Sequence, residues 1–110
     1  GTFHGIDISG VSPNIRLDRL KEIKAMIDLP LVLHGGSGTP ENDIKEAIKQ
    51  GIVKININTE NRLAFSGTLR KMMEIDKDQI TPYKYLQEPI KAVETVIGEK
   101  IRLFGSEGKA

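Results

Sequence analysis

Short apolar runs alternate with helical patterns along this chain, and that alternation constrains the fold more than any other feature. The continuous apolar run at residues 29–33 is typical of a strand buried on both faces of a sheet, and residues 52–57 are expected to form the next strand. Each is followed by residues whose apolar positions recur at helical spacing, as in βα units around a parallel sheet. A strand-like run also opens the chain at residues 2–8. We therefore predict an α/β fold with about three βα units and C-terminal helices.

Three parallel strands cannot close a barrel, and they leave two unpaired edges. An eight-unit (β/α)8 barrel, the TIM barrel, usually needs about 250 residues, whereas this chain has 110. The chain begins without Met, inside a run that looks like a strand or a loop. We therefore expect residues 1–110 to be the C-terminal part of one barrel domain.

Turn residues and periodicity place the helices between these strands. A helix is expected at about 17–27, with a stripe of Leu20, Ile23, Met26 and Ile27. Thr39 is expected to cap the next helix, with Pro40 at its first position, Ile44, Ala47 and Ile48 buried, and Gly51 ending it. Two longer helices are expected at about 60–75 and 83–104. The first would pack Phe65, Leu69, Met72 and Met73, and the second Ile90, Val93, Ile97 and Ile101.

The composition excludes several classes of function. Sixteen basic and fifteen acidic residues leave a net charge of +1, so there is no basic field to bind nucleic acid. The absence of cysteine excludes disulfides and thiolate metal sites, and it is compatible with a reducing cytoplasm. No apolar run approaches the roughly 20 residues that cross a bilayer. A membrane partner is therefore not expected.

Both histidines of the chain stand at predicted strand ends. His4 is followed by Gly5, and His34 by Gly35. The carboxyl ends of parallel strands face one shared site, so the two imidazoles could bind one Zn²⁺ ion. Two polar residues hydrogen-bonded within loops would give the same pattern, and the residues alone leave both interpretations open.

The segment 34–38 is rich in glycine and precedes a helix start. Glycine lets backbone N–H groups approach an anion, Ser37 adds a hydroxyl donor, and the helix N-terminus favours negative charge. Phosphate binding and a plain strand-to-helix turn are both consistent with this pattern.

Polar residues also stand at and just after the C-terminal end of the expected strand 52–57. Asn56, Asn58 and Thr59 could orient substrate hydroxyls or bind phosphate. Asn58 or Thr59 could equally cap the following helix, and the two roles can coexist.

These strings occur together in a known family. Residues 1–5 (GTFHG), 31–38 (LVLHGGSG) and 54–60 (KININTE) resemble, in order and spacing, the class II fructose- and tagatose-bisphosphate aldolases. The resemblance extends over essentially the whole chain. It implies a cytoplasmic, homo-oligomeric TIM-barrel enzyme of carbohydrate metabolism. Such an enzyme uses zinc to cleave a ketose phosphate into dihydroxyacetone phosphate and an aldehyde.

The resemblance also implies roles for individual residues. The two histidines, His4 and His34, match two of the three zinc ligands of the family. Gly5, Gly35 and Ser37 match phosphate-binding positions, Asn56 matches the amide that contacts the dihydroxyacetone portion, and Asn58 and Thr59 match positions that bind substrate or phosphate. The carbonyls of Gly5 and Gly35 match a monovalent-cation site found in some members.

Three departures from the family pattern limit these implications. The third zinc histidine and the catalytic aspartate of the family precede these motifs and are not among the 110 residues, so we expect no catalytic acid/base here and no activity from this chain alone. Ile8 stands where many fructose-type members have a phosphate-binding lysine. Thr81-Pro82-Tyr83 replaces an Asp-Pro-Arg segment whose arginine binds a second phosphate. A ketose with a single phosphate therefore fits as well as a bisphosphate.

Two other functions remain as alternatives. The chain could be a non-catalytic phosphate- or metal-binding module, or part of a barrel that assembles with another chain. It could also belong to a different phosphate-binding barrel enzyme, such as an isomerase, which would not need paired histidine ligands.

Overall fold

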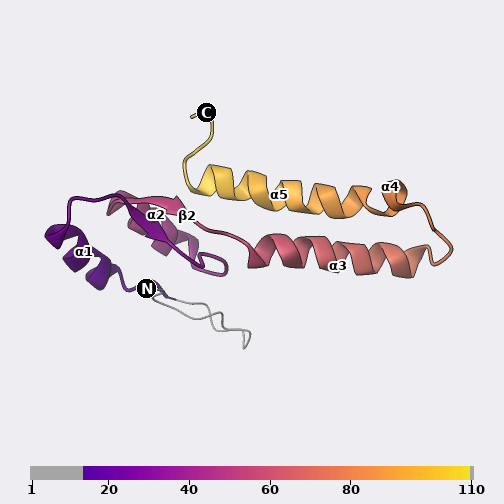
Figure 1. Cartoon of the computed structure of the whole chain (residues 1–110), viewed down its shortest axis with the longest axis horizontal. Helices are drawn as coiled ribbons and strands as arrows, with labels where there is room; N and C mark the ends of the chain where they lie inside the picture. The colour runs from indigo at the N-terminus through magenta and orange to yellow at the C-terminus, as the bar shows by residue number, and fades with distance from the viewer. Residues whose placement is uncertain (1–13, 110) are drawn as a thin grey trace. The chain divides into compact units, whose positions relative to one another are not determined.

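The computed structural model describes residues 14–109, which fall into two compact units (Figure 1). The first unit ends at Asn58 and the second begins at Thr59. The predicted strand at residues 2–8, with His4, Gly5 and Ile8, lies outside the described residues.

The first unit contains the predicted alternation of strand and helix. Its elements are α1 (Leu17–Met26), β1 (Leu31–Leu33), α2 (Glu41–Lys49) and β2 (Ile52–Ile55). The two strands pair in parallel, with α2 as the connection between them. This β1-α2-β2 arrangement confirms the α/β class and is the repeating unit of a parallel barrel.

The pairing of β1 with β2 is irregular at one point. Leu31 pairs with Ile52, but Val32 pairs with Lys54, so Val53 is an extra residue on β2. Such a bulge disturbs the simple alternation of faces along a strand. Accordingly, Ile52 is buried while Val53 and Lys54 are both exposed.

A small apolar core joins the strands to the helices of this unit. Its buried members are Leu20 from α1, Leu33 from β1, Ile44 and Ala47 from α2, and Ile52 from β2. The predicted buried side of α2 is thus correct for Ile44 and Ala47, while Ile48 is half-buried. The predicted stripe of α1 is wrong beyond its first turns, because Ile23 is half-buried and Met26 is 83% exposed.

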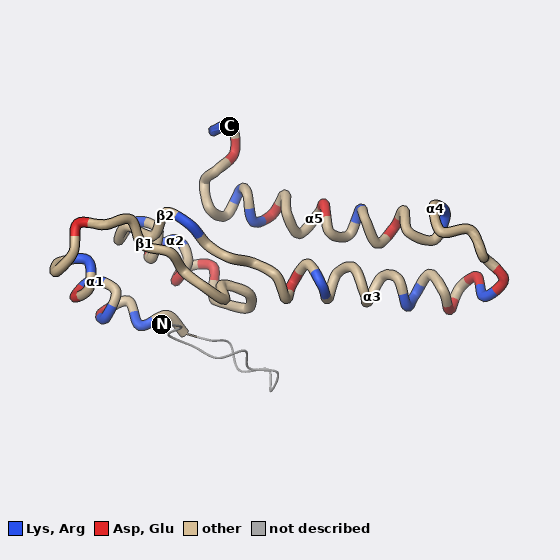
Figure 2. Tube along the Cα trace, in the orientation of Figure 1, with Lys and Arg blue, Asp and Glu red and all other residues tan. Residues whose placement is uncertain are grey.

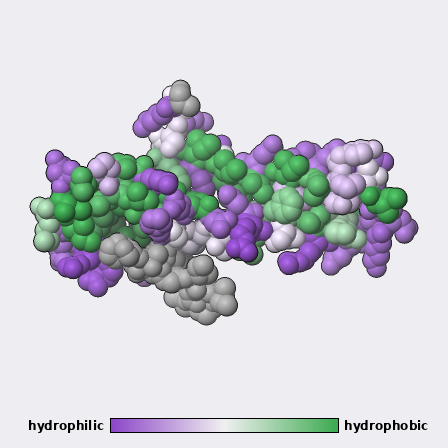
Figure 3. Space-filling view, viewed as in Figure 1, coloured by the Kyte–Doolittle hydropathy of each residue, from purple (hydrophilic) through white to green (hydrophobic). Residues whose placement is uncertain are grey.

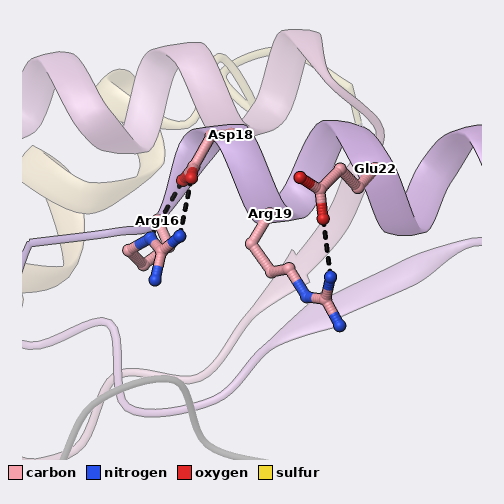
Figure 4. A network of polar contacts seen from close by, with 4 residues as sticks. All are labelled: Arg16, Asp18, Arg19 and Glu22. Atoms are coloured by element: carbon pink, nitrogen blue, oxygen red, sulfur yellow. Dashed lines mark hydrogen bonds and ion pairs between the residues drawn. The ribbon is translucent and has the colours of Figure 1, made fainter.

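Polar contacts define the beginning of α1 (Figure 4). Arg16 donates two hydrogen bonds to Asp18, at 3.0 Å from Nε and 2.7 Å from Nη2, and Arg19 pairs with Glu22 at 2.6 Å. The backbone N–H of Ile15 donates to the carboxylate of Asp43 on α2 at 3.4 Å. This last bond connects the start of α1 to α2.

The two ends of α2 differ in how well the sequence predicted them. The helix begins at Glu41, with Pro40 as the N-cap and no side-chain cap, so the expected capping by Thr39 is wrong. The hydroxyl of Thr39 is instead buried without a hydrogen-bond partner in the described chain. The predicted end is correct, since Gly51 follows the helix with φ +105°, a conformation that favours glycine.

The second unit is helical. It contains α3 (Thr59–Ile75), α4 (Pro82–Tyr85) and α5 (Gln87–Leu103), and α3 and α5 run antiparallel side by side. The single helix predicted at 83–104 is therefore wrong, because the chain breaks at Leu86. Pro89 explains the break, since a proline ring clashes with the carbonyl four residues earlier, here that of Tyr85.

The face of α5 that packs on α3 also differs from the prediction. Pro89 is buried and Val93 is half-buried, but Ile90, Ile97 and Ile101 are 50%, 44% and 42% exposed. Figure 3 shows apolar residues gathered along the visible face of α5. A half-buried ion pair of 2.5 Å between Glu60 and Lys100 connects α3 to α5.

Two global properties follow from these elements. Basic and acidic residues are interleaved along the described chain, without a segment of one sign (Figure 2). Among residues 14–109, the helices are too short or too polar to cross a membrane.

Candidate functional site

The polar residues of interest in the first unit follow the carboxyl ends of its strands. His34 comes directly after Leu33, the last residue of β1, and Asn56 directly after Ile55, the last residue of β2. The backbone N–H of Asn56 donates to the carbonyl of Leu33 at 3.0 Å, and the N–H of Gly36 donates to the carbonyl of Asn56 at 3.1 Å. These bonds continue the pairing of the two strands beyond their regular part.

The structure brings the side chains of His34 and Asn56 into contact. Nδ2 of Asn56 lies 2.9 Å from Nδ1 of His34. The imidazole is exposed and the amide is half-buried. Two of the predicted site residues therefore share one sheet edge and touch each other.

The glycine-rich turn 35–38 leads from this edge into α2. Gly35 and Gly38 have φ of 68° and 77°, which favours glycine at both positions. Gly36 is needed for a different reason, since a Cβ there would lie 2.7 Å from Cγ2 of Ile55. Its N–H already donates to Asn56, so this group is not free to bind an anion.

The remaining donors of the turn stand near the start of α2. Ser37 is half-buried between Gly36 and Gly38. The first turn of α2 supplies backbone N–H groups and the positive end of the helix dipole, which together attract anions. Glu41 and Asp43 occupy the same turn and partly offset that attraction.

Asn58 and Thr59 lie where the first unit ends and the second begins. Asn58 is exposed, and Thr59 is half-buried as the first residue of α3. The expected capping by Thr59 from outside the helix is thus not observed, since Thr59 belongs to α3 itself.

The donor set of the described residues fits a metal only in part. His34 offers one imidazole at a strand end, which suits one coordination position of zinc. No group of three His, Cys, Asp or Glu side chains that could bind a metal occurs within residues 14–109. His4, the other predicted ligand, lies outside these residues.

Sequence reasoning missed the contact of Asn56 with His34 and the steric role of Gly36. Both depend on how β1 and β2 are aligned, and the alignment includes a bulge that leaves no mark in the sequence pattern. The one available signal was that both polar residues stand at predicted strand ends.

Comparisons with known proteins agree on one family. A family model described as fructose-bisphosphate aldolase class-II matches residues 1–109. The chain is 46% identical over 110 residues to the 6-phospho-5-dehydro-2-deoxy-D-gluconate aldolase of Bacillus subtilis strain 168, covering 100% of this chain and 37% of that protein. It is 43% identical over 110 residues to a fructose-bisphosphate aldolase of Staphylococcus epidermidis, covering 100% of this chain and 38% of that protein.

Solved structures give the same result for the fold. The crystal structure of the YdjI aldolase from Escherichia coli K12 matches with a TM-score of 0.70 and 40% identity, covering 87% of this chain and 36% of that one. A fructose-bisphosphate aldolase from Campylobacter jejuni matches with a TM-score of 0.69 and 19% identity, over 83% of this chain and 35% of that one, which shows the fold alone. The chain thus spans less than two-fifths of the length of these relatives.

Proposed function

Because the chain belongs to the class II fructose-bisphosphate aldolase family, we propose that it supplies part of the active site of a zinc-dependent aldolase. The reaction is the reversible aldol cleavage of a ketose phosphate into dihydroxyacetone phosphate and an aldehyde. The observation that carries this proposal is the meeting of His34 and Asn56 at one sheet edge, directly before a glycine-rich turn.

His34 is proposed as one metal ligand and His4 as a second. A bound Zn²⁺ ion supplies Lewis-acid polarisation of the substrate ketone. Imidazole suits this role because it is a common zinc ligand, and three protein ligands with one open position are usual in catalytic zinc sites. The monovalent cation implied by the family would be held by the carbonyls of Gly5 and Gly35.

The phosphate of the substrate is proposed to bind at the turn after β1. The hydroxyl of Ser37 and the N–H groups of Gly5, Gly35 and Thr59 are the proposed donors. Because Gly36 donates its N–H to Asn56, this group is left out of the proposed pocket. A phosphate fixed in this way positions the reacting carbons and lowers the entropic part of the barrier.

Asn56 and Asn58 are proposed to contact the dihydroxyacetone portion. Amide groups can both donate to and accept from hydroxyls, so they can orient a polyol chain. No acid/base residue is proposed within the 110 residues. We accordingly propose that the chain alone is inactive and that the active protein contains further barrel strands, in the cytoplasm and as a homo-oligomer.

A substrate with a single phosphate is favoured by two features of this chain. Ile8 and Thr81-Pro82-Tyr83 replace charged groups expected for a bisphosphate substrate. The relative from Bacillus subtilis is named for a 6-phospho sugar acid, which also carries one phosphate. We therefore propose a single-phosphate ketose over a bisphosphate.

The experiment measures release of dihydroxyacetone phosphate by the protein that contains these residues within a complete barrel. We expect activity that is lost with a zinc chelator and restored by Zn²⁺. We also expect it to fall in His34→Ala by no less than the about 10–100-fold that loss of a ligand's hydrogen-bond partner costs. Asn42→Ala, an exposed change on α2, serves as the matched control and retains activity. Activity that persists with the chelator, or in His34→Ala, contradicts the proposal.

A further inference from the structure

An ion pair in the second unit joins the first turn of α3 to the last turn of α5. Oε2 of Glu60 lies 2.5 Å from Nζ of Lys100, and the two side chains are only 27% and 22% exposed. By contrast, Glu88 and Lys91 form a pair within α5 and are 49% and 65% exposed. A short charge-assisted contact with little water around it holds both groups more firmly than a surface pair does.

This ion pair is adjacent to a position proposed to bind phosphate. Glu60 directly follows Thr59, the first residue of α3. The first turn of a helix attracts anions through its backbone N–H groups and its dipole. A carboxylate in the same turn repels a phosphate, and it therefore weakens phosphate binding unless its charge is neutralised.

Lys100 supplies a neutralising charge from the other helix. Its ammonium group contacts the carboxylate directly, and the partial burial of both side chains reduces screening by water and salt. Arg62 and Arg102, the other basic residues close to this pair in the chain, are exposed and so are screened more strongly. The charge on Glu60 is thus compensated mainly by Lys100.

We propose that Lys100 is a positioning residue for the phosphate of the substrate. It neutralises Glu60 and holds that carboxylate against α5, so that the first turn of α3 can accept a phosphate at Thr59. Lys100 acts through Glu60 and does not itself touch the substrate. The inference rests on the proposed function for one point, the binding of phosphate at Thr59. Because this effect acts alike on bound substrate and transition state, it changes KM and leaves kcat unaltered.

The test measures KM, kcat and the Kd of inorganic phosphate for the protein that contains these residues within a complete barrel. We expect Lys100→Met to raise KM and the phosphate Kd about 3–20-fold, as for one uncompensated charge about 9 Å from a phosphate dianion. Lys91→Met removes a lysine from an exposed pair on the same helix and should change neither. A fall in kcat in place of the rise in KM, or no change at all in Lys100→Met, overturns the proposal.

A double variant separates charge neutralisation from a mere link between the two helices. In Glu60→Gln combined with Lys100→Met, both charges are absent and the ion pair is still broken. We expect KM and the phosphate Kd to return to their original values, because the repelling carboxylate has gone. Values that stay as high as in Lys100→Met would show that the pair only links α3 to α5, and they would refute the proposed role.

Folding of each variant is checked by thermal unfolding. Lys100→Arg keeps the positive charge and should retain the original KM, whereas a rise like that of Lys100→Met would contradict the role of charge. If Lys100→Met does not fold, Lys100→Gln takes its place with the same expectations. Lack of zinc-dependent activity, with phosphate binding that responds as expected, would count against the proposed function alone. Lack of phosphate binding by the unsubstituted protein would overturn the role of Lys100.

Discussion

Substituting Gly36 with alanine tests the close approach of the turn after β1 to the segment after β2. The new Cβ would lie 2.7 Å from Cγ2 of Ile55 and 3.2 Å from Cδ1 of Ile57, both shorter than ordinary contact. The backbone cannot easily move away, because the N–H of Gly36 donates to Asn56 and its carbonyl accepts from Thr39. The substitution therefore forces a shift in the position of β2 relative to the turn.

The magnitude follows from two opposing effects. Overpacking at a tight site costs about 1–3 kcal/mol. Alanine also lowers the entropy of the unfolded chain, which offsets about 0.4–1 kcal/mol wherever the native backbone suits alanine. Gly36 does not have a positive φ, so this offset applies. We expect Gly36→Ala to lower the free energy of unfolding of the first unit by about 1–2 kcal/mol.

The assay is urea unfolding followed by residue-resolved NMR, so that each unit is measured separately. Gly67→Ala is the matched control, because Gly67 lies inside α3 and nothing stands within 4 Å of its added Cβ. We expect that variant to be more stable by about 0.5–1 kcal/mol, as for glycine to alanine in a helix. If Gly36→Ala were equally stabilising, the close approach of the turn to Ile55 would be refuted.

Three further predictions concern Gly51, which has a positive φ, and two pairs of charged residues. Gly51→Ala should destabilise the first unit by about 1 kcal/mol or more, since φ is +105° there; an unchanged urea midpoint would contradict this. Hydrogen bonding from Arg16 lowers the pKa of Asp18 to about 2, so its stabilising contribution is present above about pH 4 and is lost as the pH falls towards 2. Arg16→Gln should raise that pKa towards its ordinary value in an NMR titration, and no change would exclude Arg16 as the main cause. A double-mutant cycle of Glu60→Gln and Lys100→Met should give a coupling energy of about 1 kcal/mol between α3 and α5, whereas additive effects would show that the ion pair contributes nothing.

The sequence predicted the features that local chemistry determines. The strand end at His34, the buried Ile44 and Ala47, and the end of α2 at Gly51 follow from periodicity and glycine conformation, whereas β2 ends at Ile55, before the expected end at residue 57. These properties depend on residues close together in the chain, so a single sequence contains the necessary information.

The features that the sequence did not predict depend on packing between elements. The apolar residues of α5 lie on more than one side of the helix, so periodicity alone does not say which side packs. In the structure Val93 is half-buried, whereas Ile97 and Ile101 are exposed. Pro89 was a signal for the break at Leu86, but the residues on both sides of the break have helical periodicity and so predicted one continuous helix. The contact of Asn56 with His34 needed the strand alignment, which periodicity does not define.

The extra residue Val53 determines which side chain reaches His34. Counting from the matched pair Leu31 and Ile52, His34 is three steps along its strand and Asn56 is four steps along its own. In a regular ladder, Ile55 would stand opposite His34, and Asn56 would point through the other side of the sheet. One unpaired valine thus exchanges an apolar neighbour of the imidazole for a hydrogen-bonding amide. Deleting any one of residues 53–55 would leave Asn56 three steps from Ile52, so that a regular ladder without the bulge would also place Asn56 opposite His34.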